Sequence, residues 1–197
     1  MRILLLMLWL LVPVGALAYH FGPGQAHLQM DSVAAILKSA RADVAEQRWG
    51  AAQAAFEQAL AQTPETETRL RQELRLEVCK SQMLNRQLPT AHDSLLGLME
   101  EVSNDPTAPP SLVQEVRASL ASSQYYLTWL MRLEGQPREK WEPEVEAARQ
   151  NYALLAEQAA ESGDTGSLKL RKEDLESAVR LARMDLGELQ GLPLPSQ

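Results

Sequence analysis

The sequence has 197 residues, of which 45% are hydrophobic, and its 26 acidic and 19 basic residues give a formal charge of −7. An acidic chain whose charges are mixed along its length lacks the basic stripe that nucleic-acid-binding proteins need, so nucleic acid is excluded as the expected partner. Cys79 is the single cysteine, which excludes an intramolecular disulfide, and we interpret it as a small core residue.

The first 18 residues have the pattern of an export signal. Arg2 is followed by an uncharged apolar stretch from Ile3 to Ala18, which ends in a small-x-small site. This order predicts a secretory signal peptide cleaved after Ala18. A membrane anchor is the alternative, because the stretch falls short of the ~20 residues needed to span a bilayer but approaches it if residues 19–21 are added. Either outcome predicts an exported chain, periplasmic or membrane-anchored.

The remaining chain is rich in alanine, leucine, glutamate, glutamine and arginine, which favour helix, and Ile36 is its only isoleucine after residue 19. We therefore predict an all-α domain over residues 31–190, between a flexible spacer at 19–30 and a disordered tail at 191–197. The apolar periodicity predicts seven helices. They cover residues 31–46, 49–62, 66–86, 89–102 and 111–133, a sixth that ends near 161, and a seventh that carries Leu175, Ala178, Val179, Ala182, Leu186 and Leu189.

Local signals refine these helices. Asp31 and Ser32 are expected to cap the first helix, and Ser111 with Gln114 forms a capping-box pattern for the fifth. The fifth helix is apolar on more than one face, which predicts a central helix covered on two sides. The segment 134–143 is expected to be the turn that follows it.

The second helix carries a spaced pattern of large and small residues. Spacings of three and four residues keep the pattern on one helix face, so that two helices approach closely at the alanines while the aromatic side chains fill the gaps. The pattern consists of Trp49, Ala52, Phe56, Ala59 and the closing Pro64.

This pattern resembles the second helix of a tetratricopeptide repeat (TPR), and Ala40 falls where the preceding helix of that family has its small residue. A second copy uses Leu88, Ala91, Leu95 and Leu98, with Val78 and Cys79 before it; a weaker third uses Val145, Ala148, Tyr152 and Leu155. The resemblance implies antiparallel helical hairpins in a TPR-like solenoid of two to three degenerate repeats with a C-terminal capping helix. The alternative is a non-repetitive Ala/Leu helical bundle.

Residues that carry chemistry are sparse. His20, His27 and His92 have no carboxylate or cysteine partner at metal-ligand spacing, and no common catalytic or nucleotide-binding motif is present. Tyr125, Tyr126 and Trp129 could stack a ligand, but they fit the core of a central helix better. We therefore expect no catalytic activity, no cofactor and no metal, and an enzyme of the cell envelope is the third hypothesis.

In the TPR family the first helix of each pair lines a concave face. Carried over, this implies partner-binding residues Leu37, Arg41 and Val44 in the first copy and Leu76, Lys80 and Met83 in the second. Two cations among apolar side chains would suit an extended protein or peptide segment that bears a carboxylate. Alternatively, these residues contact the neighbouring hairpin. The first functional hypothesis is thus a protein-binding adaptor, and the second is a membrane-tethered structural domain that self-associates or scaffolds an envelope complex.

Overall fold

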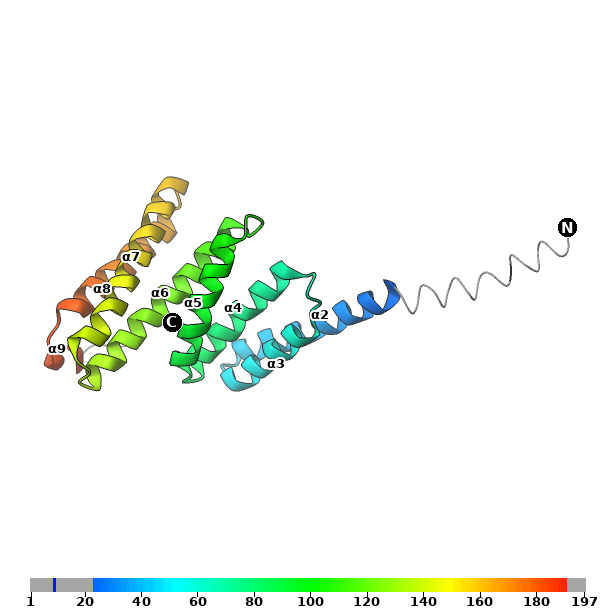
Figure 1. The fold of residues 1–197 in the computed structure, drawn as a ribbon, viewed down its shortest axis with the longest axis horizontal. Coiled ribbons are helices and arrows are strands. Elements are labelled where there is room, and N and C mark those ends of the chain that lie inside the picture. The colour runs from blue at the N-terminus through cyan, green and yellow to red at the C-terminus, as the bar shows by residue number, and fades with distance from the viewer. Residues whose placement is uncertain (1–8, 10–22, 191–197) are drawn as a thin grey trace. The chain divides into compact units, whose positions relative to one another are not determined.

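The computed structural model describes Trp9 and residues 23–190, and every regular element in that part of the chain is a helix (Figure 1). The described helices are packed in sequential antiparallel pairs. They are α2 (Pro23–Ala45), α3 (Trp49–Gln62), α4 (Thr68–Leu84), α5 (Leu88–Asn104), α6 (Pro110–Leu133), α7 (Arg138–Ser162), α8 (Thr165–Arg183) and α9 (Leu186–Gln190).

The chain divides into two compact units, residues 1–74 and 75–197, so the boundary falls inside α4. In the first unit α2 and α3 form a hairpin. Arg71 donates to the carbonyls of Leu60 and Thr63 at the end of α3, at 3.2 and 2.8 Å. Thr63 is extended because it precedes a proline, which disfavours helical backbone at the preceding residue. Pro64 therefore ends α3, as the sequence predicts.

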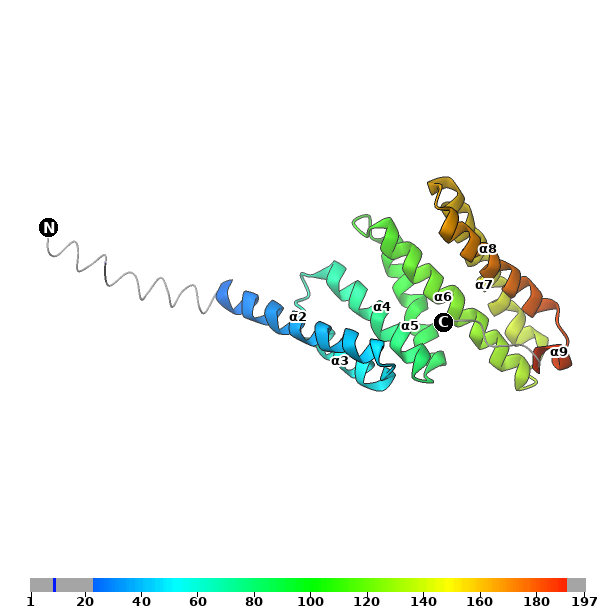
Figure 2. The same ribbon diagram turned by 180° about the vertical axis from the view of Figure 1, so that it is seen from behind.

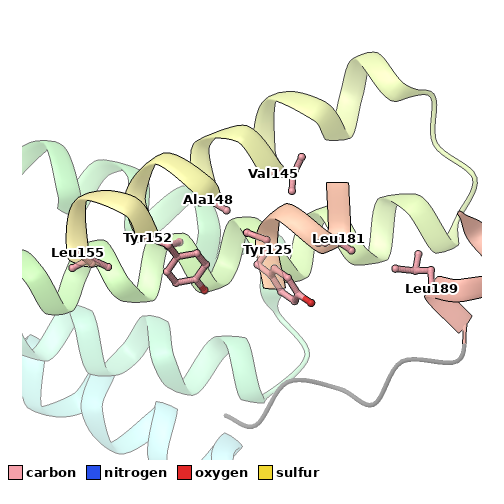
Figure 3. Close-up of a cluster of buried hydrophobic side chains, with 9 residues drawn as sticks. Tyr125, Val145, Ala148, Tyr152, Leu155, Leu181 and Leu189 are labelled. Carbon is pink, nitrogen blue, oxygen red and sulfur yellow. The ribbon is translucent and has the colours of Figure 1, made fainter. Parts of the chain in front are cut away.

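The second unit contains two hydrophobic clusters that share α6. The first, which we name the aliphatic cluster, is formed by α4, α5 and α6, and its buried members are Leu76, Cys79, Leu95, Leu98, Val102, Leu112, Val116 and Leu120. The second, the alanine–tyrosine cluster, is formed by α6 to α9 and includes Ala121, Tyr125, Val145, Ala148, Tyr152, Leu155, Ala178, Leu181 and Leu189 (Figure 3). Helices α7 and α8 lie side by side in both views of the fold (Figures 1 and 2). The predicted central helix, covered on two sides, is confirmed as α6.

Three hairpins share one turn geometry. Each turn holds one residue with a positive φ: Gln47 (57°) between α2 and α3, Arg86 (61°) between α4 and α5, and Gly135 (69°) between α6 and α7. The next residue then donates its backbone N–H to a carbonyl five residues earlier. These bonds are Arg48 to Asp43 at 2.8 Å, Gln87 to Gln82 at 2.9 Å and Gln136 to Met131 at 2.8 Å. Glycine is the residue that adopts this backbone conformation at no steric cost.

The first helix starts earlier than predicted. Helix α2 begins at Pro23, so residues 23–30 of the expected flexible spacer are helical, and Asp31 and Ser32 lie inside the helix rather than capping it. The added turns contact the end of α3 through Gln29, whose Nε2 donates to the carbonyl of Gln62 at 2.5 Å. In the predicted part of the helix, Ser32 Oγ donates to Gln62 Oε1 at 3.0 Å. The expected leader, apart from Trp9, and the tail at 191–197 lie outside the described residues.

The predicted start of the fifth helix and the turn after it are also corrected. Helix α6 begins at Pro110, with Pro109 at the N-cap and no side-chain cap bond, so Ser111 forms no capping box. Proline suits a first helical position because its missing N–H has no partner there in any case. The turn over 134–143 shrinks to residues 134–137, because α7 begins at Arg138. The third hairpin is therefore formed by helices of 24 and 25 residues, joined by the turn at residues 134–137.

The seventh predicted helix is two helices. The α8 helix ends at Arg183, and α9 starts at Leu186 with a reciprocal cap that the sequence analysis overlooked. The backbone N–H of Glu188 donates to Asp185 Oδ1 at 2.8 Å, and that of Asp185 donates to Glu188 Oε2 at 3.1 Å. Within residues 23–190, no helix combines the length and the apolar character that crossing a membrane requires.

Candidate functional site

A shallow groove of about 300 Å³ runs between α4 and α6 in the second unit. Its size is at the lower end of the range for ligand-binding clefts. Most of its lining surface is apolar, with one ion pair at the rim and three hydroxyl groups along the wall. The lining residues are Lys80, Met83 and Leu84 of α4 and Glu115, Ala118, Ser119, Ser122 and Tyr126 of α6.

Helix periodicity explains why α6 opens a groove here. Four of the α6 residues, Glu115, Ser119, Ser122 and Tyr126, follow one another at intervals of four, three and four, and Ala118 lies three residues after Glu115 and four before Ser122, so all five side chains share one face of the helix. Three of them, Ala118, Ser119 and Ser122, are small and leave space against α4. The neighbouring face of α6 carries Leu112, Val116 and Leu120, which are buried in the aliphatic cluster. The groove therefore rests on a packed helix.

Lys80 is held at the rim by two carboxylates. Its Nζ donates to Glu77 Oε1 at 2.9 Å and to Glu115 Oε1 at 2.5 Å. Burial lowers the pKa of Lys80, but the hydrogen bonds to Glu115 and Glu77 raise it further, so the net pKa lies above the usual lysine value. The lysine is therefore charged at neutral pH, and its charge is compensated within the protein.

The other end of the groove is hydroxyl-rich. Ser122 Oγ lies 3.1 Å from the hydroxyl of Tyr152, which reaches over from α7. Burial raises the pKa of Tyr152 well above the ordinary tyrosine value, so its hydroxyl stays neutral. Tyr126 packs edge-on against Tyr125, with ring centroids 5.6 Å apart and an interplanar angle of 88°. This end of the groove is thus uncharged, and its wall is anchored in the alanine–tyrosine cluster.

The structure brings together two of the six predicted partner-binding residues, Lys80 and Met83. Leu76 is only 1% exposed and packs in the aliphatic cluster, so its assignment to a binding surface is wrong. Leu37 and Val44 are half-buried and Arg41 is exposed, all on α2 in the first unit. The expected pair of cations, Arg41 and Lys80, is not present in this groove, because Arg41 does not line it. Lys80, which does, binds two carboxylates of its own chain.

The residues assigned to helix packing are mostly buried. Fully or nearly fully buried are Ala40, Ala52, Phe56, Ala59, Cys79, Ala91 and Leu95, whereas Trp49 and Pro64 are half-buried. Burial raises the pKa of the Cys79 thiol to about 11, an effect that the nearby positive charge of Arg75 reduces. The thiol is therefore protonated at neutral pH, as expected for a core cysteine.

Sequence analysis missed the acidic and small residues of the groove. Glu77 lies three residues from Lys80, but Glu115 is 35 residues away and only packing brings its carboxylate to the ammonium group. The regular spacing of Glu115, Ala118, Ser119, Ser122 and Tyr126 was the available signal, because it marks a helix face with little apolar bulk.

A second groove of about 400 Å³ lies between the start of α5, the last turns of α6 and the start of α7. Helix α6 has 24 residues and α5 has 17, so part of α6 extends beyond the neighbour that covers the rest of it. Leu127, Leu130 and Met131 line this groove, and Leu130 is 38% exposed. Its charged residues are Asp93, Glu134 and Lys140.

His92 forms the buried floor of the second groove. Its Nδ1 lies 3.2 Å from Ser123 Oγ, whose own proton is donated to the carbonyl of Leu120 at 2.7 Å. The other ring nitrogen, Nε2, lies 3.6 Å from a carboxylate oxygen of Glu144. Neither here nor anywhere else in residues 23–190 are three histidine, cysteine or acidic side chains grouped so as to hold a metal ion.

Comparison of the chain with protein-family models, with curated proteins and with solved structures finds no match in any of the three. The functional interpretation therefore depends on the packed helices and the two grooves.

Proposed function

We propose that this chain is an exported, TPR-like helical adaptor that binds a segment of a partner protein and has no catalytic activity. The observation that carries the proposal is the groove between α4 and α6. It is apolar along most of its length, polar at both ends, and formed by side chains on rigid helices. Grooves of this kind bind extended or helical segments through apolar side chains, with polar groups setting their orientation.

The repeat interpretation is supported by the shared turn of the three hairpins and by burial of the patterned residues. In the register suggested by the sequence, Trp49 and Leu88 begin α3 and α5, each two residues after the positive-φ residue of its turn. In a TPR-like solenoid, α4 and α6 would be the first helices of successive pairs, and the groove between them would lie on the concave face.

Blocking the groove tests the proposal. Ser119→Tyr places a bulky ring in the groove wall, and Ser103→Tyr makes the same change on the exposed side of α5 as a matched control. A photo-crosslinking amino acid at Met83, tested in producing cells with and without each tyrosine, identifies the protein that reaches the groove. That protein, once purified, should bind the wild-type chain and the control equally and the Ser119→Tyr variant at least tenfold more weakly.

Equal binding of the purified partner by both tyrosine variants would reject the α4–α6 groove as the binding site. Thermal melting of each variant checks that the fold is kept. N-terminal sequencing of the chain recovered from the envelope tests export separately: a mature chain that begins at Tyr19 supports the signal peptide, and an intact Met1 in a membrane fraction supports the anchor.

Self-association is a second candidate function, favoured by the apolar end of α6 in the second groove. The groove has both acidic and basic groups at its rim, Glu134 and Lys140, so two copies related by a two-fold axis could pair Lys140 of each with Glu134 of the other. Leu130→Asp should then abolish a dimer that Leu170→Asp, on α8, leaves intact. A strict monomer at high concentration in light scattering would exclude this function.

A further inference from the structure

We infer that the segment bound between α4 and α6 carries a lysine or arginine next to its apolar side chains, and not the carboxylate that the sequence alone suggests. The inference rests on the proposed function, because it specifies the partner of the same groove. It follows from how the charged groups of α4 and α6 are distributed and paired.

The rim of the groove carries more negative than positive charge. One ammonium group, Lys80, lies between two carboxylates, Glu77 and Glu115. The exposed fraction of the side chain is 56% for Glu115, 39% for Glu77 and 32% for Lys80, so the acidic groups face solvent more than the base does. A carboxylate has two oxygens with about four acceptor positions. Glu115 can therefore accept a hydrogen bond from a partner while it keeps Lys80.

The other cations of these two helices do not line the groove and are engaged elsewhere, although Nε of Arg117 has no hydrogen-bond partner. On α4 beyond residue 74, Arg75 forms an ion pair with Glu101 of α5. On α6, Arg117 donates to Asn151 Oδ1 at 3.2 Å, and Arg132 donates to the carbonyls of Leu181 and Met184. An incoming carboxylate would therefore meet only the shared Lys80 and would be repelled by Glu77 and Glu115. A cation would be attracted by both.

The apolar part of the groove sets the second requirement. Met83, Leu84 and Ala118 line it without any charged group. An apolar side chain can lose water there without leaving a buried charge unpaired. A basic residue beside such a side chain then lies at the Glu115 end, where its head remains partly in water. Pairs of this kind affect selectivity and association rate more than total affinity.

Three synthetic ten-residue peptides can test this preference with the full chain. They share a Leu-Ala-Phe centre and differ only in its two flanking residues, which are arginine, glutamine or aspartate. Binding is measured by fluorescence anisotropy at low salt and again at high salt. The arginine peptide should bind at least tenfold more tightly than the aspartate peptide, with glutamine between them, and the difference should shrink at high salt because exposed charges are screened.

Two variants test whether the rim carboxylate Glu115 causes the preference for the arginine peptide. Glu115→Gln should reduce the arginine-to-aspartate ratio to about threefold or less, because a neutral amide replaces the most exposed carboxylate. Glu100→Gln removes the same charge from an exposed position on α5 that does not line the groove, and should leave the ratio unchanged. Thermal melts confirm that both variants fold.

The outcomes separate this inference from the proposed function. Binding that Ser119→Tyr abolishes, but with equal affinities or with the aspartate peptide tightest, would overturn the basic-partner inference and leave the groove as a peptide site. If none of the three peptides binds in a way that Ser119→Tyr changes, the proposed function itself is contradicted for this class of ligand, and the inference fails with it.

Discussion

The two clusters that share α6 are held together in different ways. The aliphatic cluster consists of leucine and valine side chains with Cys79, and its stability comes from filled volume. The alanine–tyrosine cluster has less aliphatic bulk, and directional contacts surround it: the Ser122–Tyr152 hydrogen bond, and Arg132, whose guanidinium lies 4.8 Å from the ring centre of Trp141. Ion pairs also join α4 to α5 and to α6, but their side chains are largely exposed and contribute little, so we infer that filled volume dominates the packing of these three helices. Partly buried hydrogen bonds contribute more to the register of α7 and α8.

The largest expected effect is a cavity in the aliphatic cluster. Leu95 is fully buried, so Leu95→Ala should lower the free energy of unfolding by about 2–5 kcal/mol. The adjacent Leu96 is 45% exposed, and Leu96→Ala should change it by no more than about 0.5 kcal/mol. Urea denaturation followed by circular dichroism measures both. Equal effects of the two substitutions would contradict the volume-based view of this cluster.

The next largest effect is expected from removing the hydrogen bonds that Arg132 makes at the end of α8. Arg132→Met leaves the carbonyls of Leu181 and Met184 without their donor and loses the stacking on Trp141, which should cost about 2–3 kcal/mol. Lysine lacks the planar fork of arginine, so Arg132→Lys should restore only part of this stability. Hydrogen exchange should show faster exchange in residues 184–190 for Arg132→Met. Unchanged exchange there would reject the role of Arg132 in holding α9.

A pH titration sharpens the description of the aliphatic cluster. The Cys79 thiol has a pKa of about 11 in the folded chain against 9.0 for a free thiol, because burial disfavours the thiolate. Below pH 9 the thiol is protonated in both the folded and the unfolded chain, so it does not affect the pH dependence of stability. As the pH rises from 9 toward 11, only the unfolded chain loses this proton, which should lower the free energy of unfolding by about 1 kcal/mol at pH 10. Cys79→Ala should lose less stability than the wild type between pH 8 and pH 10. Parallel curves for the two proteins would contradict a buried thiol.

The smallest effect concerns one hydrogen bond at the groove. Tyr152→Phe removes the hydroxyl that contacts Ser122, which should cost about 0.5–1.5 kcal/mol. Ser122 lines the groove, so water can replace the lost partner and limit the cost. A double-mutant cycle with Ser122→Ala isolates the pair, and a coupling energy near zero would show that this contact does not fix α7 on α6.

Much of the fold could be predicted from local sequence. Alanine spacing marked Ala52 and Ala59 as buried positions, and Pro64 marked the end of a helix, because propensity and proline geometry act within a few residues. The errors were also local. Asp185 and Glu188 form a reciprocal cap that could have been found, but the apolar spacing continued through it and favoured one long helix.

The candidate site could be predicted only in part. Lys80 and Met83 were assigned to a groove, yet Leu76 was assigned with them, because periodicity places an apolar residue on a face without showing which neighbour covers it. The charge distribution around Lys80 could not be predicted from the sequence either. The sequence shows that Lys80 is positively charged. The electrostatic potential at the groove also depends on Glu115, whose carboxylate is brought beside Lys80 only by helix packing.

The sequence by itself determined an all-helical chain, the approximate ends of most helices, the central position of α6 and the burial of the alanine pattern. These properties follow from propensities, caps and periodicity, which act over a few residues along the chain. The tertiary structure alone decided that Glu115 neutralises Lys80 across 35 residues, and that Arg132 binds the end of α8. Such contacts depend on how helices are positioned against one another, and that positioning is a sum of many weak packing interactions.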